Sequence, residues 1–150
     1  MIISADKDFA QLQINSNVKQ YSPMTKKLIV EKNPRTFLLE HVLKGDSSDG
    51  VPNVLSDDDV FVDGRRQTPL SAKKKAALME DPSALGQDVL RNIQRNRTMI
   101  DLMELPEAIK LDIINNYDSQ DPTENKSKVL NYLINKRCRL LIESVGEFIL

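Results

Sequence analysis

The feature that most constrains the fold is a series of prolines, each of which follows a residue that can cap a helix. Proline is favoured in the first helical turn because its missing N–H is not needed there and its φ angle already suits a helix. Such pairs occur at Asn33-Pro34, Thr68-Pro69, Asp81-Pro82 and Asp121-Pro122, and Pro106 adds a fifth start. They predict helices over residues 33–43, 68–79, 81–97, 106–117 and 121–136, with a further helix over the last dozen residues.

The first 32 residues have a different pattern. Residues 1–4 form an apolar run that stops at acidic residues, which is typical of a buried strand with carboxylates at its C-terminal end. Residues 8–12 indicate one or two helical turns. Residues 17–21 and 28–31 are predicted strands, and the turn-like segment 22–25 indicates that they form a hairpin. The fold class is therefore α/β: a short strand and a hairpin, followed by a mainly helical body.

The first strand presents a topological problem. A buried parallel strand needs neighbours, and parallel strands need crossover connections. Because the two later strands are predicted to pair with each other, we expect Ile2-Ile3-Ser4 to have no parallel partner within this chain. Either another polypeptide supplies that partner, or the strand is not packed as in a complete protein.

Composition excludes several classes of protein. The chain has 150 residues and a net charge of −1, so it fits one domain and bulk charge indicates no polyanionic partner. Cys138 is the single cysteine, which excludes an internal disulfide and a thiolate zinc site. His41 is the single histidine, and we predict a packing role for it. Without a long apolar run or a signal peptide, the protein is expected to be cytoplasmic and not to associate with a membrane.

Two short acidic segments carry the candidate chemistry. Asp6 and Asp8 follow the first strand, and Asp46 and Asp49 lie in a loop that contains Gly45 and Gly50. Crowded carboxylates bind hard divalent cations because an oxygen-liganded ion relieves their repulsion. Two alternatives stay open: Asp8 caps a helix with Asp6 as an ordinary turn residue, and the second segment is a solvated acidic loop.

Four segments together resemble the bacteriophage RNase H branch of the flap endonuclease and 5′-nuclease family. They are residues 3–12, residues 17–24 with Lys26-Lys27, residues 43–51, and residues 96–106. The resemblance implies that residues 1–32 are the C-terminal part of the nuclease α/β core. It also implies that residues 33–150 are a helical DNA-binding domain with a helix–three-turn–helix element.

The same resemblance implies roles for individual residues. Asp6 and Asp8 would be catalytic metal carboxylates, and Asp46 and Asp49 would hold a second, looser metal ion, partly through waters. The ions would be Mg²⁺, with Mn²⁺ as a substitute, and K⁺ could sit at the helix–three-turn–helix loop. The residues implied to contact DNA are Lys26, Lys27, Lys44, Gly45, Ser47, Gly50, Arg65, Arg66, Lys73 and Lys74.

Two departures limit what the resemblance implies. Residues 53–59 lack the glycine of the family's second turn, and the family's N-terminal half, with the first metal carboxylates, is absent from this sequence. We therefore expect the C-terminal half of a magnesium-dependent 5′-3′ exonuclease and flap endonuclease, inactive without a separate N-terminal half. Its substrates would be RNA-primed, nicked or 5′-flapped duplexes. The alternatives are a non-catalytic duplex-DNA-binding module, and an interaction domain whose helices over residues 81–150 dock on a replication protein such as a single-stranded-DNA-binding protein.

Overall fold

The computed structural model describes residues 1–120 and 128–148, the last of these by backbone only. The chain divides into two compact units, Met1–Leu105 and Pro106–Leu150. The boundary predicted between residues 32 and 33 falls inside the first unit, and that division into domains stays a prediction.

A small sheet opens the first unit. Its strands are β1 (Ile2–Ile3), β2 (Gln20–Ser22) and β3 (Lys27–Ile29), in the order β1-β2-β3. β2 and β3 are antiparallel, with Tyr21 opposite Leu28, so the predicted hairpin is confirmed. β1 runs parallel to β2, with Ile2 opposite Gln20.

The prediction that β1 has no parallel partner in this chain is wrong. The connection between β1 and β2 contains a 3-10 helix, η1 (Lys7–Ile14), which carries the chain back to start a parallel strand. A crossover needs a dozen or more residues, and the stretch between Ile3 and Gln20 is long enough. The sequence interpretation treated β2 only as a hairpin strand, and it overlooked that the other edge of β2 could pair with β1.

Three helices complete the first unit: α1 (Pro34–Lys44), α2 (Ala72–Glu80) and α3 (Gln87–Ile100). α1 begins at the predicted proline and ends at Gly45. α2 begins later than predicted, because the side chain of Ser71 accepts a hydrogen bond from the Lys74 amide and caps the helix there. α3 also begins later, after Gly86, because Asp81 and Ser83 form a local turn instead of a helical one.

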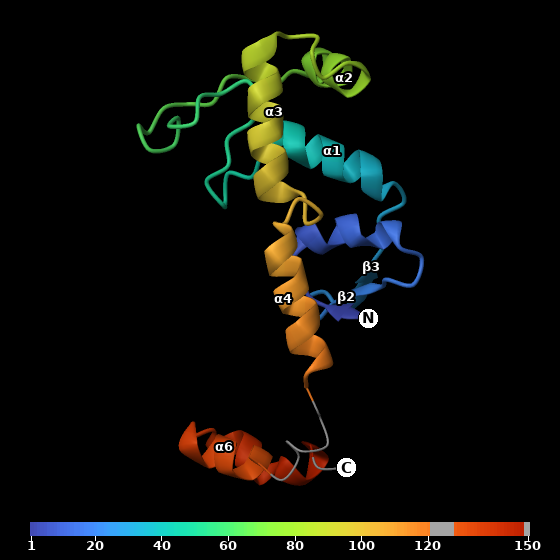
Figure 1. Cartoon of the computed structure of the whole chain (residues 1–150), viewed down its shortest axis with the longest axis vertical. Helices are drawn as coiled ribbons and strands as arrows, with labels where there is room; N and C mark the ends of the chain where they lie inside the picture. The colour runs from blue at the N-terminus through green and yellow to red at the C-terminus, as the bar shows by residue number, and fades with distance from the viewer. Residues whose placement is uncertain (121–127, 149–150) are drawn as a thin grey trace. The chain divides into compact units, whose positions relative to one another are not determined.

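The hydrophobic core lies where these helices meet. α1 lies across α3 (Figure 1), and α1 also packs against η1 and α2. Leu43, Val54 and Leu78 are fully buried. The loop between α1 and α2 contributes core residues as the helices do, so it is held by packing. The core cluster consists of Val42, Leu43, Val51, Val54, Leu78, Ile93 and Ile100.

The second unit is helical. It contains α4 (Glu107–Asp118), α6 (Val129–Asn135), α7 (Arg139–Glu143) and the 3-10 helix η3 (Val145–Phe148). The predicted start after Pro106 is confirmed, whereas the start predicted at Asp121-Pro122 lies outside the described residues. Among the described helices of both units, none combines the length and the apolar character needed to cross a membrane.

Candidate functional site

The turn from β1 into η1 positions the first acidic segment. Asp6 caps η1: its carboxylate accepts a hydrogen bond from the Asp8 amide at 2.9 Å. The alternative in which Asp8 is the cap is therefore wrong. Gln20 is fully buried, and its Nε2 donates to the carbonyls of Ser4 and Asp6 at 3.0 and 2.6 Å. These bonds fix the backbone of the turn and leave the side chain of Asp8 to face α1.

The end of α1 positions the second acidic segment. Gly45 terminates the helix with φ at +68°, a conformation that non-glycine residues rarely adopt. Asp46 follows and forms an isolated bridge to Val51, which closes a tight turn. Within this turn the Asp46 carboxylate accepts hydrogen bonds from the Ser48 amide at 3.1 Å and from the Ser48 hydroxyl. The side chain of Asp46 is thereby directed back toward α1.

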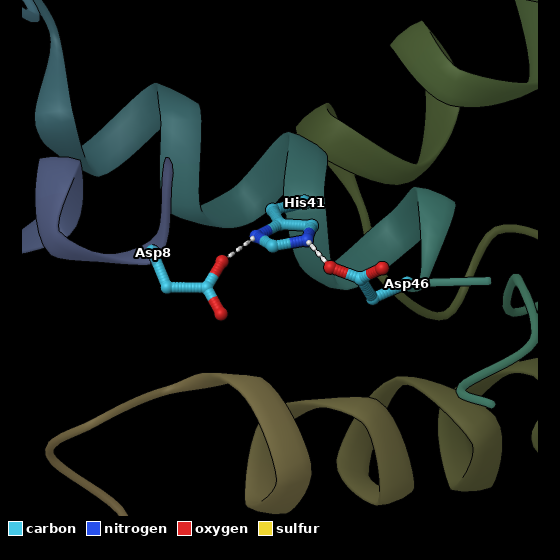
Figure 2. Close-up of side chains that lie close together, drawn as sticks. All are labelled: Asp8, His41 and Asp46. Carbon is cyan, nitrogen blue, oxygen red and sulfur yellow. Dashed lines mark hydrogen bonds and ion pairs between the residues drawn. The ribbon is translucent and has the colours of Figure 1, made fainter. Parts of the chain in front are cut away.

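The two acidic segments meet on either side of His41, as Figure 2 shows. Its Nε2 lies 3.1 Å from Oδ2 of Asp46, and its Nδ1 lies 3.5 Å from Oδ1 of Asp8. His41 is 8% exposed and Asp46 is 4% exposed, whereas Asp8 is 30% exposed. Lys7 also reaches Asp46, with Nζ 2.7 Å from Oδ2. We call Asp8, His41 and Asp46 the histidine cluster.

The two carboxyl groups of the histidine cluster have opposite electrostatic environments. The Lys7 ammonium, followed by the Ser48 hydroxyl, holds the pKa of Asp46 well below its ordinary value. Burial raises the pKa of Asp8, and this effect outweighs the opposing attraction of His41. The hydrogen bond to Asp46 also raises the pKa of Lys7, in keeping with the ion pair between them. Asp46 is thus a fully paired anion, while Asp8 is a carboxyl group that resists ionisation.

Two buried atoms of the histidine cluster lack hydrogen bonds. Oδ1 of Asp8 and Nδ1 of His41 face each other, and neither has a hydrogen-bond partner among the residues that the structure describes. One ligand atom from each of Asp8, His41 and Asp46 lies within 4.8 Å of the other two. Unpaired polar atoms are rare in protein interiors. Their convergence here makes this cluster the candidate site for a cation.

The structure therefore brings together two of the four predicted metal residues, Asp8 and Asp46. Asp6 and Asp49 are exposed nearby: the charge of Asp6 contributes to the raised pKa of Asp8, and the charge of Asp49 to that of Lys7. Their role in metal binding stays a prediction. The sequence interpretation missed His41 and Lys7. The position of His41 could have been recognised from the sequence, because it lies in the last turn of a predicted helix that leads into an acidic loop.

The residues predicted to contact DNA differ in whether their side chains already form ion pairs within the protein. Arg65 forms ion pairs with Asp57 at 3.0 Å, with Asp63 at 3.2 Å and with Asp59, so its charge is already compensated. Lys44 pairs with Glu40 at 3.3 Å. The other predicted DNA-contact residues that are exposed are Lys26, Lys27, Ser47, Gly50, Arg66, Lys73 and Lys74. Exposure leaves these groups available to a phosphate, and their contact with DNA stays a prediction.

A second polar group, on α3, holds the loop that follows Asp46. Asn96 is fully buried, and its Nδ2 donates to the carbonyls of Val42 and Pro52, both at 2.8 Å. Asn92 donates to the carbonyl of Val54 at 3.0 Å, and Arg95 donates to that of Pro52 at 3.1 Å. We call Asn92, Arg95 and Asn96 the α3 clamp. It was not predicted, because polar residues inside a helix do not reveal which distant carbonyls they bind.

The chain is similar to known proteins. Residues 33–148 match the family model described as T4 RNase H, C terminal. The whole chain is also similar to the Ribonuclease H of Enterobacteria phage T4. The two are 30% identical over 157 aligned residues, which cover 99% of this chain and 51% of the phage protein. The chain thus spans about half the length of the curated relative that it matches.

Proposed function

Since the chain belongs to the T4 RNase H C-terminal family, we propose that it is the C-terminal half of a magnesium-dependent 5′-3′ exonuclease and flap endonuclease. Its substrates would be RNA primers and 5′ flaps during DNA replication. One observation carries this proposal: two acidic segments that are far apart in the sequence meet at the histidine cluster. The N-terminal half of such an enzyme would supply the remaining carboxylates, and residues 1–150 alone would have little activity.

The residues at the site suit hard cations. Asp6, Asp8, Asp46 and Asp49 offer carboxylate oxygens, the ligands that Mg²⁺ prefers, and Mn²⁺ can substitute. When bound, two such ions would activate a water and neutralise charge on the scissile phosphate. Asp8 has a buried oxygen without a hydrogen bond in the described part of the chain, so it would bind an ion directly. Asp46 already accepts bonds from Lys7, His41 and Ser48, so it would act through water.

We further propose that α1, the loop from Gly45 to Val54 and the following residues form the helix–three-turn–helix element that grips duplex DNA. The amides of Gly45, Ser48 and Asp49 already donate within the chain, so the turn over residues 45–50 would bind a phosphate through its other backbone groups, directly or through K⁺. Lys73 and Lys74 are exposed on α2 and would contact the DNA backbone without reading its sequence. Arg65 would first have to leave its three carboxylates.

A second candidate function is a DNA-binding module without catalysis. The observation that favours it is the pairing of Asp46 with Lys7, His41 and Ser48, which opposes a direct bond from this carboxylate to an ion. In that case Asp46 would serve to shape the loop and Asp6 to cap η1, and DNA binding would not depend on Asp6 or Asp8. The interaction-domain alternative, in which the helices over residues 81–150 dock on a replication protein, stays a prediction.

A nuclease assay distinguishes these functions. The full chain would be incubated with Mg²⁺ and a 5′-flapped duplex, alone and with a separately produced N-terminal half of phage T4 Ribonuclease H. We expect cleavage only in the mixture. Cleavage by the chain alone would show that its own carboxylates suffice. Binding without cleavage in either sample would favour the DNA-binding module.

Two sets of variants sharpen the assay. Asp6→Asn should abolish cleavage by the mixture with little change in DNA affinity, whereas Asp112→Asn, an exposed carboxylate on α4, should leave cleavage unchanged. The double change Lys73→Ala and Lys74→Ala should reduce the slope of log K against log salt by up to about 1.8, because each phosphate contact contributes about 0.9. The matched pair Lys19→Ala and Lys32→Ala, also exposed, should leave that slope unchanged.

A further inference from the structure

We propose that Nδ1 of His41 and the carboxylate of Asp8 bind a divalent transition-metal cation of the Co²⁺ or Zn²⁺ type, with Asp46 holding the imidazole from behind. This inference deepens the proposed function, since it adds a nitrogen ligand to a site otherwise formed by carboxylates. The two proposals share Asp8 as a metal ligand. The metal site itself requires neither DNA binding nor cleavage.

The hydrogen bond to Asp46 determines which nitrogen of His41 is available. Both oxygens of Asp46 already face donors, since Nζ of Lys7 lies 2.7 Å from Oδ2 and the Ser48 amide donates to Oδ1 at 3.1 Å, so this carboxyl group serves as an acceptor. Nε2 of His41, 3.1 Å from Oδ2 of Asp46, must therefore carry a proton. In the neutral imidazole the lone pair is then on Nδ1, the nitrogen that faces Asp8.

That lone pair faces a carboxylate oxygen in a buried position. Nδ1 of His41 and Oδ1 of Asp8 are 3.5 Å apart, and both lack a hydrogen-bond partner within the described ranges. An unsatisfied buried polar atom costs roughly 1–3 kcal/mol. Two such atoms that point at each other repel, unless a cation lies between them. A metal ion is one such cation, and a proton on the imidazole is the alternative that the experiment must exclude.

The spacing and the chemistry of the two atoms suit a metal ion. Ligands with bonds of about 2.0–2.2 Å to one ion are separated from each other by about 3.0–3.5 Å in octahedral or tetrahedral geometry. The observed 3.5 Å lies in this range. Imidazole nitrogen favours Co²⁺, Zn²⁺ and similar ions, whereas Mg²⁺ prefers oxygen. A metal-binding histidine also usually donates its other N–H to a carboxylate, as His41 does to Asp46.

Because His41 is the only histidine, nuclear magnetic resonance reports on it without assignment ambiguity. The experiment uses the full chain without a histidine tag, with Cys138→Ser to remove the single thiol. On addition of Zn²⁺, we expect the ¹⁵N resonance of Nδ1 to shift and Nε2 to stay protonated. An imidazole that is protonated on both nitrogens and does not respond to Zn²⁺ would overturn the proposal.

Calorimetric titration with Co²⁺ supplies a second readout in the same background. His41→Gln and Asp8→Asn each remove a ligand and should weaken Co²⁺ binding at least tenfold. Asp46→Asn should weaken it about tenfold to a hundredfold, because the imidazole is no longer held in place. The control Asp112→Asn should not change it. Equal binding by the parent chain and by a folded His41→Gln variant would overturn the proposal. If His41-dependent binding is found but the mixture with the N-terminal half neither cleaves nor binds DNA, the proposed function fails and this inference stands. If the mixture cleaves DNA but Co²⁺ binding does not depend on His41, the proposed function stands and the metal site proposed at His41 fails.

Discussion

The histidine cluster and the α3 clamp are two buried polar groups that both involve α1, the first through the side chain of His41 and the second through the carbonyl of Val42, and they differ in how completely they are paired. In the clamp, Asn96 donates to two carbonyls, and its oxygen accepts a bond from Arg95 at 2.9 Å. In the cluster, Asp8 and His41 each keep a buried atom without a hydrogen bond among the described residues. A fully paired group stabilises the fold, whereas a group with unpaired atoms costs stability and is expected where a ligand binds.

The largest effect is expected at the junction of the two groups. In a Gly45→Ala variant the new Cβ would lie 2.5 Å from the carbonyl oxygen of Pro52 and still closer to that of Val51. These are backbone atoms that cannot rotate away, and the φ of +68° adds strain. We expect the free energy of unfolding to fall by about 4 kcal/mol or more in urea titrations.

Gly50→Ala is the matched control, because Gly50 also has positive φ, but beyond its chain neighbours no atom of the described residues lies within 4 Å of an added Cβ. It should cost only about 1–2 kcal/mol, the strain of the backbone conformation alone. Equal losses of unfolding free energy at the two glycines would mean that the backbone at Gly45 can shift at little cost and that Asp46 is not held rigidly.

The next largest effect tests the clamp. Asn96→Ala removes the donor to the carbonyls of Val42 and Pro52, which remain buried. We expect a loss of about 3 kcal/mol in the free energy of unfolding, measured beside Gln94→Ala on the exposed face of the same helix. A loss as small as that of the control would show that water replaces the amide and that the clamp is not structural.

The sequence predicted features that depend on neighbouring residues and missed those that depend on residues far apart in the chain. Local signals placed α1, α4 and the hairpin well, because proline at a helix start and a turn between two strands act over a few residues. The acidic segments were found because each is contiguous. The pairing of β1 with β2, the contact of His41 with Asp8 and the α3 clamp were missed, because each depends on residues far apart in the sequence.

A third prediction concerns Asp46, the paired member of the histidine cluster. Asp46→Asn removes the charge that Lys7, His41 and Ser48 hold, and should lower the free energy of unfolding at neutral pH by about 2 kcal/mol. Because the pKa of Asp46 is lowered in the folded state, its contribution is present above the ordinary value of 3.8 and is lost as pH falls below that value. Unfolding measured at pH 7 and at pH 3 should therefore show a smaller difference from the parent chain at pH 3. A constant difference would show that the Asp46 charge contributes nothing.

The smallest effect, with the opposite sign, is expected at Asp8. Burial raises its pKa above the ordinary 3.8, so its contribution to stability is full below that value and is lost as pH rises through the raised pKa. At pH 7 the Asp8→Asn variant should therefore be more stable than the parent by about 0.5–1 kcal/mol. Asp112→Asn is the control that should not change stability. The difference between Asp8→Asn and the parent should shrink toward pH 4.

The response to Co²⁺ provides a second test at Asp8. Because a ligand stabilises the state that binds it, Co²⁺ at ten times its dissociation constant should raise the free energy of unfolding of the parent chain by about 1.4 kcal/mol and should not raise that of the Asp8→Asn variant. A destabilised Asp8→Asn chain that does not respond to Co²⁺ would mean that Asp8 is a structural contact like Asn96, and the contrast between the two groups would be lost.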